Sequence, residues 1–72
     1  MIKNDPLKTA YAVARTLQSK GYEAGVIFSA EEVSIAIKIN GRLLETKICE
    51  ELANMGDEWL ANKFEEYIKK IN

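Results

Sequence analysis

The chain opens with apolar residues at the spacing of an amphipathic helix. At 100° per residue one broad side carries Leu7, Ala10, Tyr11, Val13, Ala14 and Leu17. Asp5 is a preferred N-cap residue, and Pro6 follows at the first helical position, where its missing N–H costs nothing. Lys20 and Gly21 supply the cation and the left-handed stop that are typical of a helix end. The pattern predicts a helix over residues 5–20.

The next segment carries two conflicting signals. Residues 29–32, Ser-Ala-Glu-Glu, match the Ser-x-x-Glu capping box of a helix start, whereas residues 33–39 alternate apolar and polar positions as a strand does. A strand over residues 22–28 and a four-residue hairpin loop over 29–32 would place apolar residues opposite each other. The predicted pairs are Phe28 with Val33, Val26 with Ile35, Ala24 with Ile37, and Tyr22 with Ile39. As a helix, residues 33–39 would scatter four β-branched side chains around the circumference, so the pairing favours a strand.

Asn40-Gly41 indicates a second hairpin, because a type I′ turn requires positive φ at both central positions. In this register Ile37 faces Leu44, Ile35 faces Thr46 and Val33 faces Ile48. The alternative is a helix that starts near Arg42, since Leu44, Ile48, Leu52 and Met55 also have helical spacing. We expect a short strand over residues 42–46 and a helix that begins near Thr46.

The last segment is helical, but its apolar stripe changes phase around Gly56-Asp57. We expect two helices, over residues 46–55 and 57–71, or one sharply kinked helix. The predicted structure is thus a single α+β domain over residues 1–72, of order αβββαα. Helices would cover one face of a three-stranded antiparallel meander, the face with Val26, Phe28, Val33, Ile35, Ile37 and Leu44. Its open face would be mixed in character and shallow at Gly25 and Ala36.

Composition argues against a catalytic or metal site. The chain has 72 residues, 47% of them hydrophobic and 29% charged, which is typical of a folded globular protein. It contains no histidine, which is the commonest general base and metal ligand. The single cysteine, Cys49, precludes an intrachain disulfide, and Glu50 and Glu51 beside it disfavour a reactive thiolate. We therefore expect a protein that is not an enzyme and that has no metal and no cofactor.

The predicted location is cytoplasmic. No uncharged apolar run approaches the roughly 20 residues that a membrane span needs, and the N-terminus has no signal-peptide core. The net charge of −1 gives no general attraction to nucleic acid or to an anionic membrane. The charges are nevertheless uneven, since basic residues dominate the first 22 positions and acidic residues dominate positions 45–72.

Two kinds of binding site are compatible with this pattern. The first is a protein contact through Met55, Trp59 and Leu60, where the apolar stripes change phase, because tryptophan and methionine are favoured at contact surfaces. The partner would be another protein or the chain itself, and an uncovered sheet edge or the open sheet face offers a further route. The identity of the partner and the oligomeric state are left open.

The second kind is a phosphate site on the basic side of the first helix, formed by Lys8, Arg15 and Lys20. The order αβββα resembles the double-stranded-RNA-binding domain, and this resemblance in element order implies RNA binding. Such domains carry a lysine cluster at the start of the helix after the third strand. Residues 46–51 instead end in Glu50 and Glu51, which would repel phosphates, so nucleic acid is the less favoured partner.

Overall fold

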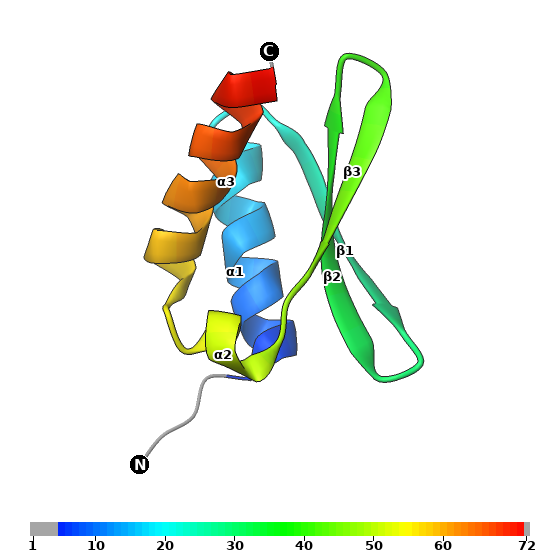
Figure 1. Ribbon diagram of the computed structural model, residues 1–72, viewed down its shortest axis with the longest axis vertical. Coiled ribbons are helices and arrows are strands. Elements are labelled where there is room, and N and C mark those ends of the chain that lie inside the picture. The colour runs from blue at the N-terminus through cyan, green and yellow to red at the C-terminus, as the bar shows by residue number, and fades with distance from the viewer. Residues whose placement is uncertain (1–4, 72) are drawn as a thin grey trace.

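The computed structural model describes residues 5–71, and in that range all the helices lie on one side of a three-stranded sheet (Figure 1). The elements in chain order are α1 (Pro6–Ser19), β1 (Glu23–Ser29), β2 (Glu32–Ile39), β3 (Arg42–Lys47), α2 (Glu50–Ala53) and α3 (Asp57–Ile71). The strands are antiparallel and lie in the order β1-β2-β3. The predicted α+β class and the order αβββαα are confirmed.

α1 begins and ends where the local signals place it, within one residue at each end. The Asp5 carboxylate accepts a hydrogen bond from the amide of Leu7 at 3.0 Å, as an N-cap residue does. Gly21 has φ of +95°, the left-handed conformation that ends a helix. One face of the helix is buried and consists of Thr9, Ala10, Val13, Ala14 and Leu17.

The registers of both hairpins agree with the prediction. Phe28 pairs with Val33 and Val26 with Ile35 in the first hairpin, and Ile37 pairs with Leu44 in the second. β2 has five buried apolar residues, and four of them are β-branched. These four, which all face the helices, are Val33, Ile35, Ile37 and Ile39. Burial of that continuous face fixes the register, because a shift by one residue would expose it.

The loop of the first hairpin is shorter than predicted. Ser29 pairs with Glu32, so the turn has two residues, Ala30 and Glu31, in place of the expected four. Both residues have positive φ, of 50° and 65°, as does Asn40 in the second turn, with φ of 50°. The backbone twist of paired strands favours this type of turn, and here it prevails over the preference of alanine and glutamate for negative φ.

The predicted helix start at Thr46 is wrong. β3 continues to Lys47, and the amide of Ile48 still donates to the carbonyl of Val33 at 2.8 Å. α2 therefore begins at Glu50 and forms a single turn, and pairing with β2 prevails over the helical spacing in this stretch. Of the two alternatives for the end of the chain, the structure has two helices, with Gly56 at φ of +93° between them.

The core lies between α1, α3 and the central strand. Its fully buried large side chains are Val13, Leu17, Ile35 and Ile68. Phe28 was expected beneath the helices but is 60% exposed. The twist of the sheet carries the hairpin between β1 and β2 away from the helices, so the helix layer does not reach its tip (Figure 1).

Candidate functional site

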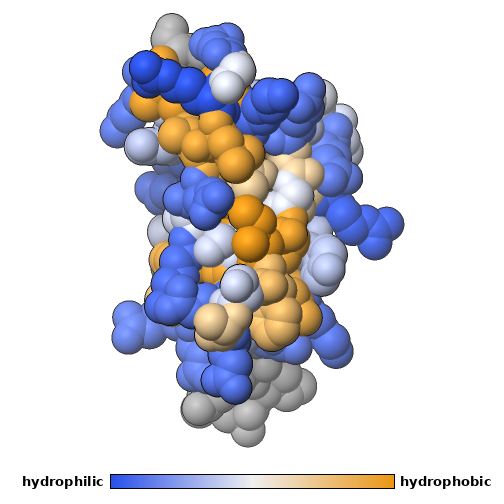
Figure 2. Space-filling model, turned by 90° about the vertical axis from the view of Figure 1, so that its right-hand side faces the viewer, coloured by the Kyte–Doolittle hydropathy of each residue, from blue (hydrophilic) through white to orange (hydrophobic). Residues whose placement is uncertain are grey.

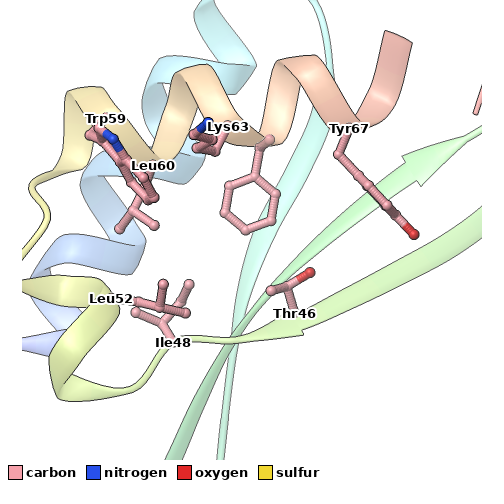
Figure 3. Close-up of a pocket in the computed structure, with 8 residues that line it drawn as sticks. Thr46, Ile48, Leu52, Trp59, Leu60, Lys63 and Tyr67 are labelled. Carbon is pink, nitrogen blue, oxygen red and sulfur yellow. The ribbon is translucent and has the colours of Figure 1, made fainter. Parts of the chain in front are cut away.

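The most distinctive surface feature is an apolar groove between α3 on one side and α2 and the end of β3 on the other. It has a volume of about 360 Å³ and is lined by Thr46, Ile48, Leu52, Trp59, Leu60, Lys63, Phe64 and Tyr67. In Figure 3 the Leu60 side chain of α3 points across the groove toward Ile48 and Leu52, and Tyr67 points toward the strand that carries Thr46. Clefts of this size, lined mostly by apolar and aromatic side chains, are typical of binding sites.

The groove exists because α3 packs against α1 more than against the sheet. The main contacts of α3 are with α1 and α2, whereas the main contacts of β3 are with β2. On α3, Ala61 and Ile68 are buried against this helical layer. Leu60 and Phe64 form the floor of the groove, at 3% and 8% exposure, so its base is continuous with the core.

Aromatic side chains stand at the rim of the groove. Trp59 is 39% exposed and Tyr67 is 52% exposed, on the same side of α3 two turns apart. Tyr67 also borders a second depression of about 340 Å³, which reaches Leu44 and Ile71. The two depressions together follow α3 along most of its length, and we call this combined surface the α3–β3 groove.

The groove holds few polar groups. The polar side-chain groups of its lining residues are the Thr46 and Tyr67 hydroxyls, the Trp59 indole N–H and the Lys63 ammonium. The ammonium lies 5.4 Å from the centre of the Trp59 ring and 3.3 Å from the Glu66 carboxylate, so Lys63 holds the indole through a cation–π contact. Such a lining can bind apolar side chains but contains no acid–base pair.

One edge of the sheet lies beside this groove. The Ile48 amide points toward β2, and backbone direction alternates along an antiparallel strand. Leu43, Glu45 and Lys47 therefore direct their amides and carbonyls away from β2, toward solvent. At the other edge of the sheet, the Gln18 side chain donates a hydrogen bond to the carbonyl of Ala24 at 2.6 Å. One of the outward backbone groups of β1 is therefore already bonded.

The open face of the sheet is the other apolar surface. A band of apolar residues runs down this face between polar flanks (Figure 2). Leu43 is 59% exposed and Ile27 is 37% exposed, while Ala36 is covered by its neighbours. A broad depression of about 560 Å³ lies on this face, and Gly25, Ala36 and Leu43 are among the residues that line it.

The residues predicted for a protein contact lie in different places. Trp59 and Leu60 line the groove, one at its rim and one at its floor, whereas Met55 is 49% exposed and lies outside the lining. Sequence reasoning missed Phe64 and Tyr67. Their spacing from Leu60 was visible as part of the apolar stripe of the last helix, but only the position of α3 shows which of them remain exposed.

Of the predicted phosphate residues, Lys8 and Arg15 lie on α1, and Lys20 is its C-cap residue. Lys8 and Arg15 are exposed, and Lys20 forms an ion pair with Glu65 of α3. The hydrogen bond from Lys20 lowers the pKa of the Glu65 carboxyl below its usual value of 4.5, and Coulombic attraction to Lys20 and Lys69 and a hydrogen bond with Tyr22 act in the same direction. The positive charge of Lys20 is thus compensated within the fold.

Residues 5–71 offer few other reactive or metal-binding side chains. Cys49 is a free, exposed thiol, and no group of three potential metal ligands comes together in this range. None of the helices described is long and apolar enough to cross a lipid bilayer.

Comparison with known proteins gives no match among family models, curated proteins or solved structures.

Proposed function

We propose that this chain is a protein-interaction module that binds another polypeptide in the α3–β3 groove. The observation that carries this proposal is the placement of an apolar groove, with Trp59 and Tyr67 half-exposed at its rim, directly beside an uncovered strand edge. Aromatic residues are enriched at the centres of protein interfaces. A strand edge adds backbone hydrogen bonds to an incoming segment, and the adjacent groove selects its side chains.

The chemistry of the groove favours a polypeptide over a polar substrate. Its lining offers mainly apolar and aromatic contacts, and its polar groups are the Thr46 and Tyr67 hydroxyls, the Trp59 indole N–H and the Lys63 ammonium. An apolar segment of a partner would bury the exposed rings, and the free energy gained would scale with the apolar area removed from water.

Site-specific photo-cross-linking tests this proposal with an internal control. A photoreactive phenylalanine derivative is placed at Tyr67, which is 52% exposed in the groove, or at Tyr11, which is 55% exposed on α1. After irradiation in a lysate of the source cells, we expect discrete covalent protein adducts from position 67 and few from position 11. Equal labelling at both positions, or none at position 67, would contradict the proposal.

The nucleic-acid hypothesis has weaker support. Lys8 and Arg15 lie about two helical turns apart on α1, and the third candidate, Lys20, is paired with Glu65. If the basic side of α1 binds RNA, Lys8→Glu combined with Arg15→Glu should abolish binding, and the affinity of the unmodified chain should fall steeply with salt. Absence of binding to duplex or single-stranded nucleic acid at low salt would rule this hypothesis out.

A further inference from the structure

We propose that the polypeptide which occupies this site is a second copy of the same chain, held by antiparallel pairing of β3 with β3. In the proposed register Glu45 lies opposite Lys47 of the second copy, and Lys47 lies opposite its Glu45. This inference rests on the proposed function, because it assigns the partner of the same groove. Three features carry it: the free edge, the charge order along that edge, and the position of the groove.

The free edge is β3. Its outward backbone groups belong to Leu43, Glu45 and Lys47, and no helix packs extensively on this strand. β1, the other edge strand, has the side chain of Gln18 bonded to its Ala24 carbonyl. An incoming strand would have to displace that hydrogen bond at β1, whereas β3 offers its groups directly. Uncovered strand edges are templates for pairing with another chain.

The order of charges on β3 selects one register. When a two-fold axis perpendicular to the sheet relates the two copies, residues whose side chains lie on the same face of the sheet stand opposite each other. Glu45 can then lie opposite Gly41, Leu43, Glu45 or Lys47 of the second copy. Pairing Glu45 with itself places two like charges opposite each other, and pairing Lys47 with itself does the same. The register that joins Glu45 to Lys47 forms two opposite-charge pairs at once and also makes these residues the hydrogen-bonded positions.

Both charged side chains are accessible for this contact. Glu45 is exposed, and among residues 5–71 the ion pairs do not include it. The Lys47 ammonium lies 3.1 Å from the Glu32 carboxylate, and both of these side chains are 60% exposed. An ammonium donates three hydrogen bonds, so Lys47 can keep Glu32 and also reach Glu45 of the second copy.

The same register brings the two grooves together. Its centre is Thr46, which faces the helix side of the sheet and lines the groove. The grooves of the two copies therefore lie side by side along the paired strands, on the same face of a continuous six-stranded sheet. Trp59 and Tyr67 of each copy would then face a shared apolar space, which explains why the exposed rings and the free edge occur on the same side of the molecule.

Reciprocal charge reversal tests the register. In the Glu45→Lys chain both paired positions are cationic, and in the Lys47→Glu chain both are anionic, so each variant alone should dimerise at least about tenfold more weakly than the unmodified chain. An equimolar mixture of the two variants restores both opposite-charge pairs and should form a heterodimer. Sedimentation velocity over a wide concentration range measures each species, and far-UV circular dichroism verifies that each variant is folded.

Glu23→Lys on β1 is the matched control, since it makes the same charge change at the other edge and should leave dimerisation unchanged. The proposal is overturned if the unmodified chain stays monomeric at the highest soluble concentration, if Glu45→Lys dimerises as well as the unmodified chain does, or if the folded variants fail to pair when mixed. A monomeric chain that still forms adducts through position 67 with other proteins would overturn this inference but leave the proposed function standing.

Discussion

Ala30 and Glu31 occupy a conformation that neither residue prefers. They form the turn between β1 and β2 with φ of 50° and 65°, and left-handed backbone costs a residue with a Cβ roughly 1–2 kcal/mol. Asparagine and glycine adopt it readily. We therefore expect Ala30→Asn combined with Glu31→Gly to raise the free energy of unfolding by about 1 kcal/mol, measured by urea denaturation.

A substitution in the turn between β2 and β3 provides a control with the opposite expected effect on stability. Gly41 has φ of +81°, so Gly41→Ala introduces strain there even though a Cβ would meet no neighbouring atom. This variant should lower the free energy of unfolding by about 1 kcal/mol. The interpretation of the turns would be wrong if the Asn-Gly variant were less stable than the unmodified chain while Gly41→Ala left stability unchanged.

The ion pair between Lys20 and Glu65 makes stability depend on pH. Lys20 lowers the pKa of the Glu65 carboxyl in the folded chain, mainly by a side-chain hydrogen bond. The stabilisation is complete above the usual value of 4.5, decreases as pH falls below it, and is lost once pH passes the lower pKa of the folded state. In denaturation curves between neutral and acidic pH, Glu65→Gln should lose less stability on acidification than the unmodified chain. Parallel pH dependence of the two chains would show that the pair contributes nothing.

At the scale of the elements, the strands were predictable because their pattern is redundant. The register of the first hairpin followed from several apolar pairs that agree, including Val26 with Ile35 and Phe28 with Val33. α2 was predicted too long because Ile48 fits both a strand and a helix, and nothing local shows that its amide bonds to Val33. Several apolar pairs that agree determine the strand register, whereas the single ambiguous residue Ile48 does not determine where β3 ends and α2 begins.

Neighbouring residues of α3 should respond very differently to truncation. Ile68 is 1% exposed in the core, and Tyr67 is 52% exposed at the groove. Ile68→Val should lower the free energy of unfolding by about 0.5–1.5 kcal/mol and Ile68→Ala by about 2–5 kcal/mol, whereas Tyr67→Ala should cost less than about 1 kcal/mol. Chemical denaturation of the three variants measures this order. If Tyr67→Ala cost as much as Ile68→Ala, Tyr67 would belong to the core and not to a free surface.

At the scale of the whole molecule, the groove is a consequence of how the helices share the sheet. α1 covers β1 and β2, and α3 packs beside α1 without covering β3. The apolar stripe of the last helix was visible in the sequence, but the position of that helix depends on the contact between α1 and α3. The spacing of Leu60, Phe64 and Tyr67 therefore predicted a helix with an apolar side and could not predict which part of that side remains open.

A chain of 72 residues gains from covering such a surface. A domain of this size buries only about 60% of the surface that its unfolded chain exposes, so its stability is modest. Association of a second copy at the α3–β3 groove would add apolar burial and would raise the apparent stability with protein concentration. The shape of the monomer and the charge order of β3 thus favour the same assembly.

Residue-resolved hydrogen exchange tests this assembly most directly. In the monomer the amides of Glu45 and Lys47 point to solvent, and in the proposed dimer they form hydrogen bonds across the axis. Their exchange should slow markedly as the protein concentration rises, while the amide of Val26 at the other edge stays unchanged and that of Leu44, bonded to β2, stays slow throughout. Fast exchange of Glu45 and Lys47 at every concentration would contradict the proposed pairing of β3.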